Sequence, residues 1–440
     1  MTPQSAQEPS AAPPAVEAAA TEPPVTEPPA TEPPLLSPHE LWESPEWLGR
    51  DVRIGGRVIA GQRGWQLADA FAAIEVVLEH GEPPPFAALA VAQGHWAGHR
   101  LESARLLEQH ANDTGLLPPE FERAASGVGR RLQLRARVLG ELRRFFLERD
   151  FLEVDTPIRA SECAIEPHIH SLRSASSGRG EAPGERYLIT SPELYMKRLL
   201  VAGVPRLFQL VHCFRAEELG PLHASEFLML EWYRAFAGWQ DVLSDTEQLL
   251  SRVCQRVLRG SELLTASGTR IDLRPPFARL SVREAFARFA GVSDASELAA
   301  RDEDQFFQLL VDRIEPALAS FTRPVFLHDY PSSQAALARV SPHDPSVAER
   351  FELYVAGVEL CNGFGELTDA VEQRRRAELD REHCRALGHP VPELPERFLT
   401  ALRHGMPRAG GNALGVDRLV MLLAGESNID AVRPFPSESV

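Results

Sequence analysis

RLFQLVHCFRAEELGPLHASEFLMLEWYRAF, residues 206–236, decides the fold of this chain. Two runs of apolar and aromatic residues flank a polar loop, a pattern that predicts two antiparallel strands. Alternation along the second strand gives one face an aromatic ring, a carboxylate and a phenol, from Phe227, Glu231 and Tyr233. The other face is mainly apolar, so we expect it to pack in a core.

Arg215 is predicted to project from the first of these strands, on the face of Cys213. An arginine that projects from a sheet costs free energy unless an anion meets it. A phosphate or a substrate carboxylate would serve as that anion. The alternative is a structural ion pair with a carboxylate of the sheet, which is the commoner arrangement.

A second hairpin is predicted in FELYVAGVELCNGFGE, residues 351–366. With a two-residue turn at 356–357, Glu352 and Glu359 become diagonal neighbours on one face, about 7 to 8 Å apart between backbones. Two carboxylates this close repel each other, so a divalent cation is the natural neutraliser. A magnesium ion shared with nucleotide phosphates fits, and the alternative is a solvated strand face. The glycines that follow permit bends that turn Glu366 inward.

Three further segments contain candidate residues. Glu193 follows Pro192 at a predicted helix start in TSPELYMKRLL, residues 190–200, where it either favours the helix dipole or joins other acids. Arg418 lies at the start of an apolar helix in GVDRLVMLL and opposes the helix dipole, so we expect it to bind another group. His168 and His170 have strand spacing without a third ligand and are left unassigned.

The chain is predicted to have three parts. Residues 1–38 are rich in Pro, Ala, Glu and Thr, with TEPP at Thr21, Thr26 and Thr31, and predict a disordered tail; the alternative is a polyproline-type spacer or docking peptide. Residues 39–115 contain short β-type runs broken by Gly and Pro and predict a small β-barrel. Residues 116–440 are predicted to form the catalytic part.

The catalytic part is predicted to be an α+β domain around an antiparallel sheet, with no parallel βαβ repeat. Neither a P-loop nor a Rossmann fingerprint occurs in the sequence, so ATP, if it is used, needs another device to hold it. Helices are expected over 239–259, 281–290, 303–319, 369–388 and 395–404, and a last one in ALGVDRLVMLLAG, residues 413–425.

Composition narrows the classes of protein. The net charge of −16 argues against a broad surface for nonspecific nucleic-acid binding. Five cysteines without a C-x-x-C pair indicate neither a zinc module nor a disulfide framework, and they fit a reducing cytoplasm. No apolar run has the length of about 18 residues that a membrane helix needs, so no membrane span is expected.

These stretches together resemble class II aminoacyl-tRNA synthetases of the lysyl subgroup over most of residues 128–433. The first motif resembles FLEVDTPI with Pro157, the second resembles FRAEELGPLHASEFLMLEWY, and the third resembles ALGVDRLVMLL. Within the subgroup the chain is closer to the elongation factor P lysine ligase family, because of TSPELYMKRLL, YPSSQAALA and Ala413. The N-terminal barrel resembles the OB-fold of lysyl-tRNA synthetases.

The resemblance implies a role for each matching residue. Arg215 and Arg418 would be the catalytic pair. The ATP-binding residues would be Arg215, Glu217, Phe227, Glu352, Glu359, Leu360, Gly415 and Arg418, with magnesium on Glu352 and Glu359. The lysine pocket would comprise Ser191, Pro192, Glu193, Glu231, Tyr233, Asn362, Glu366 and Ala413. Several carboxylates in that pocket suit a substrate with two ammonium groups.

The implied activity uses ATP to convert lysine or β-lysine to an adenylate and transfers it to a lysine side chain of elongation factor P, in a cytoplasmic homodimer. Lysyl-tRNA synthetase, with tRNA as the acceptor, is one alternative, and a noncatalytic paralogue that binds lysine or nucleotide is another. The chain departs from the family at Ala216, Ala224, Ser225 and Gly365, where the family shows amides or larger residues. These departures weaken the expected ATP contacts or alter the acceptor.

Overall fold

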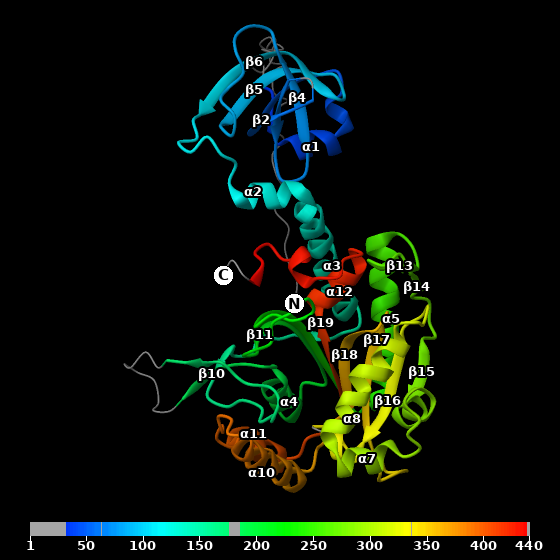
Figure 1. Cartoon of the computed structure of the whole chain (residues 1–440). Coiled ribbons are helices and arrows are strands. Elements are labelled where there is room, and N and C mark those ends of the chain that lie inside the picture. Colours follow the sequence, from blue (N-terminus) through cyan, green and yellow to red (C-terminus); the bar gives the residue numbers. More distant parts are fainter. Residues whose placement is uncertain (1–31, 63, 176–184, 336, 438–440) are drawn as a thin grey trace, which may run out of the picture. The chain divides into compact units, whose positions relative to one another are not determined.

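The computed structural model describes residues 32–62, 64–175, 185–335 and 337–437. The chain divides into two compact units, one up to Leu117 and the other from Pro118 (Figure 1). The tail expected over residues 1–38 lies outside the described residues as far as residue 31. Of its remainder, Leu35–Leu36 form strand β1, and Ser37 caps helix α1, Pro38–Glu43.

The N-terminal unit is a closed five-stranded barrel. Strand β2 pairs with both β3 and β5, which completes the circuit β2-β3-β4-β6-β5. The strands are β2 Asp51–Ala60, β3 Trp65–Ala68, β4 Ala73–Leu78, β5 Leu89–Trp96 and β6 Arg100–His110. Alternate residues of β2, such as Val52 and Ile54, are fully buried in the barrel core, as a strand with one inner face requires. The predicted OB-like barrel is confirmed.

The second unit contains an eight-stranded sheet in the order β15-β16-β17-β18-β19-β12-β11-β7. Its strands are β7 Leu152–Glu153, β11 Arg206–Phe214, β12 Glu226–Ala235, β15 Ala278–Ser281, β16 Val325–Pro331, β17 Val347–Val355, β18 Val358–Gly365 and β19 Ala409–Gly415. The six strands from β16 to β11 are antiparallel to their neighbours, which confirms the expected core and the strand pair of residues 206–236.

One edge of this sheet has a parallel connection that the sequence did not reveal. β15 is parallel to β16, and the connection between them is built of helices α6 to α9. A parallel crossover unit is therefore present at this edge, as a single unit beside an antiparallel sheet and not as a βαβ repeat. The sequence conceals it because β15 is only four residues long and its crossover is divided into short helical segments.

β19 was not predicted as a strand, because glycine is depleted in strands. Here the glycines allow close approach to neighbouring groups. A Cβ atom on Gly410 would lie 2.6 Å from the backbone oxygen of Gly238, and one on Gly411 would lie 2.3 Å from the ring of Tyr233. Only a chain without side chains at these positions fits between β12 and β18.

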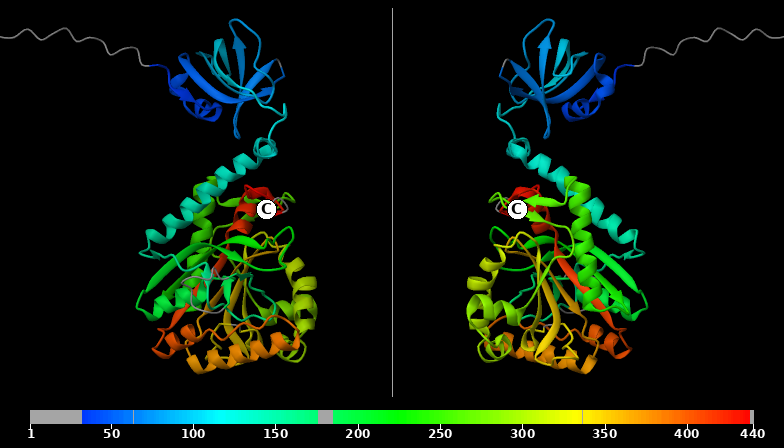
Figure 2. Two further views of the ribbon diagram at one scale, coloured as in Figure 1. Left: turned by 90° about the vertical axis from the view of Figure 1, so that its left-hand side faces the viewer. Right: turned by 90° about the vertical axis from the view of Figure 1, so that its right-hand side faces the viewer.

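Helices cover the sheet and border its ends. They are α2 Pro119–Arg123, α3 Gly129–Leu147, α4 Glu193–Val201, α5 Trp239–Leu258, α6 Val282–Ala285, α7 Ala295–Arg301, α8 Glu303–Leu309, α9 Glu315–Leu318, α10 Ala370–Ala386, α11 Glu396–Arg403 and α12 Val416–Leu423. The long helices α3 and α5 pack side by side (Figure 2). No helix of the described part is both long and apolar enough to cross a membrane.

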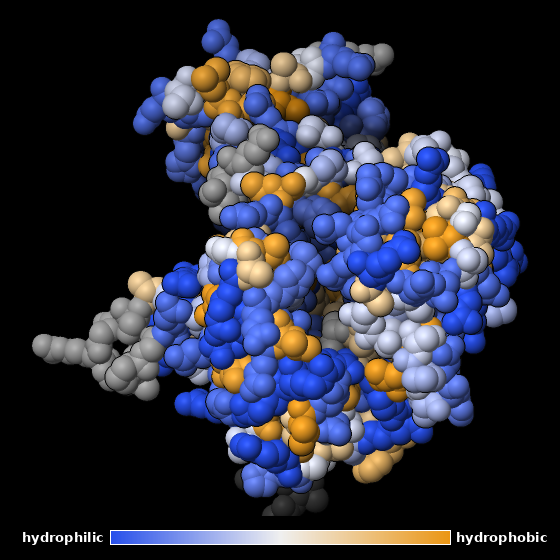
Figure 3. Space-filling view, turned by 60° about the horizontal axis from the view of Figure 1, so that its bottom comes forward, coloured by the Kyte–Doolittle hydropathy of each residue, from blue (hydrophilic) through white to orange (hydrophobic). Residues whose placement is uncertain are grey.

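The two faces of β12 have different functions, as its alternation predicts. Leu230 and Trp232 are fully buried in the main core with residues of α3 and α5. Phe227 and Glu231, on the other face, line a cavity. Helices α10 and α11 lie at the end of the unit that faces the viewer in Figure 3, where hydrophilic residues predominate. The cavity therefore lies against the face of the sheet opposite the main core, and residues of α10 and α11 border it.

Candidate active site

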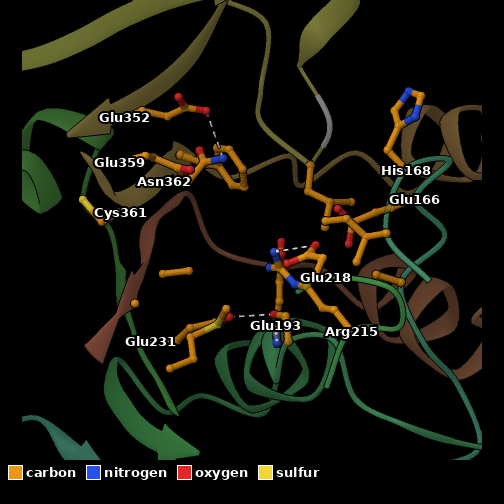
Figure 4. Close-up of a pocket in the computed structure, with 18 of the residues that line it drawn as sticks. Glu166, His168, Glu193, Arg215, Glu218, Glu231, Glu352, Glu359, Cys361 and Asn362 are labelled. Carbon is orange, nitrogen blue, oxygen red and sulfur yellow. Dashed lines mark hydrogen bonds and ion pairs between the residues drawn. The ribbon is translucent and has the colours of Figure 1, made fainter. Parts of the chain in front are cut away.

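One cavity of about 590 Å³ brings together most of the predicted site residues (Figure 4). This volume suits a nucleotide or another small molecule. The predicted residues that line it are Ser191, Glu193, Arg215, Phe227, Glu231, Glu352, Glu359, Leu360, Asn362, Ala413, Gly415 and Arg418. Pro192, Glu217, Tyr233 and Glu366 are not among its lining residues. Most residues predicted from the sequence to form the site thus line one cavity, and the role of each residue stays a prediction.

Glu231 is the central carboxylate of the expected lysine pocket. Its side chain is 1% exposed, and its oxygens accept hydrogen bonds from Ser191 Oγ at 2.6 Å and from Tyr233 Oη at 2.8 Å. Burial, followed by the charge of nearby Glu193, raises the pKa of Glu231 to about 8. A cation that enters the cavity would favour the ionised form, so this carboxylate is prepared to bind an ammonium group.

Behind the pocket wall a fully buried lysine joins two of the predicted acids. Lys197 forms ion pairs with Glu193, one helical turn earlier on α4, and with Glu366, whose oxygen lies 2.5 Å from Nζ. Burial lowers the pKa of Lys197, but the two carboxylates outweigh burial and raise it above its usual value. Burial raises the pKa of Glu366 to about 7, against the attraction of Lys197. Lys197 therefore stays charged within the cluster that it forms with Glu193 and Glu366.

Lys197 was missed in the sequence, although it lies four residues after Glu193 on an otherwise apolar helix face. That spacing was the available signal. Its consequence is a charge balance: one buried ammonium group offsets part of the negative charge of Glu193, Glu231 and Glu366. Two net negative charges would remain with all three carboxylates ionised, which matches the two ammonium groups of lysine.

Arg215 projects into the cavity from the end of β11. Its guanidinium carbon lies 5.1 Å from the centre of the Phe227 ring, and its nearest carboxylate is that of Glu218, at 3.6 Å. Within the described residues the buried Nε of Arg215 has no hydrogen-bond partner. This arrangement leaves donors free for an anion such as a phosphate. Glu217, expected at the adenine, is 84% exposed, whereas its neighbour Glu218 lines the cavity.

Arg418 binds other groups, as its unfavourable place at a helix start predicted. It donates to the backbone oxygens of Leu222 at 3.1 Å and Glu359 at 2.8 Å, and to Nε2 of His223 at 2.7 Å. Burial and then the charge of Arg418 lower the pKa of His223, so this ring is neutral and accepts the hydrogen bond. Arg418 thereby joins the loop between β11 and β12 to strand β18.

The hairpin of β17 and β18 has the predicted turn at 356–357 and an unpredicted β-bulge. Beyond the bulge Glu352 pairs with Asn362, whereas a regular ladder would pair it with Cys361. The pairs next to the turn, Tyr354 with Glu359 and Val355 with Val358, follow the predicted register, but Glu359 is one residue farther along the strand than a diagonal neighbour of Glu352 would be, so that predicted placement was wrong. A bulge adds one residue to one strand, and this shift follows directly. Both carboxylates nevertheless line the cavity.

The two acids differ in their capacity to hold magnesium. Glu352 accepts hydrogen bonds from Tyr330 at 2.5 Å, Tyr354 at 2.8 Å and Arg350 at 2.7 Å, so its oxygens are already occupied. Glu359 is 38% exposed and pairs weakly with an arginine at 3.3 Å. No group of three His, Cys, Asp or Glu side chains in the described ranges could hold a metal ion. The donor set fits an ion bound mainly by nucleotide phosphates, with Glu359 as the accessible carboxylate.

Of the two unassigned histidines, His168 lies on the side of the cavity away from the hairpin (Figure 4). His168 is exposed and lines the cavity, with its ring 5.9 Å from that of His383 on α10. His170 has its Nε2 3.1 Å from Nδ1 of His389. Neither histidine belongs to a metal-binding group of described residues.

Comparison with known proteins identifies the family. Residues 123–439 match the family of tRNA synthetases class II (D, K and N). The elongation factor P–(R)-β-lysine ligase of Proteus mirabilis is 41% identical over 309 residues, which are 69% of this chain and 93% of that protein. The chain belongs to this ligase family. The ligases of Edwardsiella ictaluri, at 42% identity over 68% of this chain and 93% of the relative, and Salmonella gallinarum, at 40% over the same shares, agree.

The family confirms the expected class II core and a ligase, and it implies the use of ATP. The comparison also shows that the N-terminal barrel lies outside the part shared with the Proteus mirabilis ligase. Only 7% of the Proteus mirabilis relative lies outside the match, which is too little to contain a five-stranded barrel. The catalytic unit is thus the part shared with that ligase.

Proposed function

We propose that this protein uses ATP and magnesium to activate lysine or β-lysine as an adenylate, and then transfers the lysyl group to a lysine side chain of elongation factor P. The observation that supports it best is that one cavity contains both a buried carboxylate, Glu231, and the guanidinium of Arg215, whose buried Nε has no hydrogen-bond partner in the described residues. The Glu231 carboxylate suits an ammonium group of the amino acid, and the Arg215 guanidinium suits a phosphate of ATP. The named relatives supply elongation factor P as the acceptor.

In the first step the substrate carboxylate attacks the α-phosphorus of ATP, and pyrophosphate leaves. The nucleophile is already ionised, so no general base is needed. Arg215 would hold the α-phosphate while Phe227 stacks under the adenine, and Arg418 would lie near the leaving phosphates. Positioning and neutralisation of charge then supply the rate. Magnesium, held by Glu359 with Glu352 behind it, would neutralise further phosphate charge when bound.

In the second step an acceptor amine attacks the carbonyl carbon of the adenylate. An amide bond forms and the bond to AMP breaks.

The proposed cytoplasmic location is supported by five buried cysteines that are all free thiols.

The proposed active form is a homodimer that uses the segment around FLEVDTPI. Leu147 at the end of α3 and Leu152 on β7 support it, because they are 54% and 55% exposed. Exposed leucines that lie close together along the chain suit an interface more than they suit solvent.

The first test is pyrophosphate exchange with α-lysine, (R)-β-lysine, arginine and leucine as the amino acids. We expect exchange with one or both lysines only, and a large loss in the Glu231→Gln variant at lysine concentrations below the KM. Exchange with leucine would refute the carboxylate pocket. Folded protein without any exchange would favour the noncatalytic paralogue.

Lysyl-tRNA synthetase is a second candidate because of the barrel. Its five strands close as in an OB-like fold, a fold that binds single-stranded nucleic acids. The part of the Proteus mirabilis ligase outside the match is too short to form such a barrel. Removal of residues 1–117 separates the candidates: the lysine-modifying activity would persist without the barrel, whereas tRNA charging would fall.

A further inference from the structure

One part of the cavity, an acidic chamber, is lined by residues outside the proposed ATP and lysine sites. We define this acidic chamber by Glu166, Glu303, Gln373 and Asp380, all of which line the same cavity. Figure 4 places Glu166 on the side of the cavity opposite Glu352 and Asn362. None of these chamber residues has a part in the activation step described above.

Glu166 stands between the reaction centre and the rest of the chamber. The charged groups that face it are Arg215 at the end of β11, Glu193 on α4, Asp380 on α10 and Arg350 on β17. Within the described residues its carboxylate has neither a hydrogen bond nor an ion pair, although its backbone is held by a bridge to Ile169. Burial, partly offset by Arg215, raises the pKa of Glu166 to about 7.

Gln373 shows independently that one buried oxygen of the chamber lacks a hydrogen-bond donor. Its side chain is 4% exposed on the inner side of α10, yet its Oε1 atom has no partner in the described part of the chain. Buried oxygens are normally satisfied, so a ligand that donates hydrogen bonds is expected at this point. Glu166 and Asp380 likewise offer only acceptors when ionised. The complementary ligand is an ammonium group.

We propose that the acidic chamber binds the ε-ammonium group of the acceptor lysine and that Glu166 takes up its proton before transfer. This inference rests on the proposed function, since it assigns the acceptor to a place in the same cavity. The substrate lysine already has Glu193 and Glu231, so a second set of acceptors serves a second amine. The proximity of Glu166 to Arg215 puts that amine beside the adenylate.

The proton balance requires such a group. A lysine ε-amine has a pKa of about 10.4 and is almost fully protonated at neutral pH, so it cannot attack. Transfer of one proton to the Glu166 carboxylate leaves a neutral amine, whose lone pair forms the C–N bond while the bond from the acyl carbon to AMP breaks. The new amide nitrogen then loses its remaining extra proton to the departing phosphate. Glu166 releases its proton to solvent after the product leaves.

The test compares the two half-reactions in Glu166→Gln. Pyrophosphate exchange with lysine measures activation, and transfer of labelled lysine from the enzyme-bound adenylate to elongation factor P measures the second step. We expect transfer to fall about 100- to 10,000-fold, far more than exchange. Wild-type transfer should rise with pH and level off above about 7, whereas the variant should keep rising toward pH 9. Glu166→Asp should restore part of the rate.

Glu382→Gln is the control, because Glu382 is an exposed carboxylate on α10, the helix of Gln373 and Asp380, and does not line the cavity. It should behave as wild type in both assays. Equal transfer by wild type and Glu166→Gln, with normal exchange, would overturn the inference. So would a variant that needs more lysine for exchange but transfers normally at saturation, since Glu166 would then bind the activated lysine. Wild-type exchange without any label on elongation factor P would refute the proposed function itself, and this inference with it.

Discussion

Lys197→Met tests the charge balance behind the substrate pocket. Methionine has similar length and would fill most of the space, so packing changes little. The substitution leaves the carboxylates of Glu193 and Glu366 without their cation in a place where Lys197 is 0% exposed. Loss of one partner from a buried ion pair costs about 3 to 5 kcal/mol. We expect the free energy of unfolding of the catalytic unit to fall by about that amount at pH 8.

The pH dependence gives this prediction its sign. Burial holds the folded-state pKa of Glu366 at about 7, above its unfolded value, and the loss of Lys197 would raise it further. A group of this kind destabilises the folded protein as pH rises through its folded pKa. The loss in Lys197→Met should therefore be smaller at pH 6 than at pH 8, because Glu366 then takes a proton.

Urea unfolding followed by circular dichroism measures this at both pH values, with the transition of the catalytic unit identified by its shift when ATP and lysine are added. Arg198→Met is the matched control on the same helix, and it should cost less than about 1 kcal/mol, because Arg198 is partly exposed and stacks on Tyr195 without a buried ion pair. A loss below about 1 kcal/mol in Lys197→Met, or an equal loss at pH 6 and pH 8, would refute the reasoning.

Four further predictions concern the site. Glu231→Gln should raise the KM for lysine in pyrophosphate exchange about 10- to 100-fold with little change in kcat, because one charge-assisted hydrogen bond is lost; an unchanged KM would exclude Glu231 as the ammonium ligand. In the wild type the same KM should fall as pH rises from 6.5 to 8.5, since lysine prefers the ionised form of a carboxylate whose pKa is about 8, and Glu231→Gln should flatten that profile. Arg215→Ala should lower kcat for exchange about 100- to 1,000-fold, and Arg215→Lys should not restore it, because lysine lacks the planar fork; full activity in either would remove the arginine from the chemistry. Glu359→Gln should raise the magnesium concentration needed for half-maximal exchange, and an unchanged requirement would place the metal elsewhere.

The parts of the site that the sequence predicted well are those with a local period. The alternation of β12 separates Glu231 from Trp232, and this separation is correct because a strand has a period of two wherever it pairs. The turn at 356–357 was equally local. Such patterns fix a face or a turn without any knowledge of the partners.

The parts that the sequence missed depend on distant partners. In the sequence, Lys197 is one basic residue on an apolar helix. Its role depends on its ion pair with Glu366, which lies far along the chain. The glycines of β19 looked like a loop until their neighbours on β12 were known. The bulge in β18 shifted Asn362 by one position, which no residue type in the hairpin demands. Contacts between distant segments, and not local propensity, decide these features.

The acceptor is the central claim, and one competition measures it directly. Purified protein is supplied with ATP, magnesium, labelled lysine or (R)-β-lysine, and both elongation factor P and tRNA in equal amounts, and the labelled macromolecule is identified after separation. We predict label on elongation factor P, at one lysine side chain. Label on tRNA, with none on elongation factor P, would contradict the account and make this protein a lysyl-tRNA synthetase.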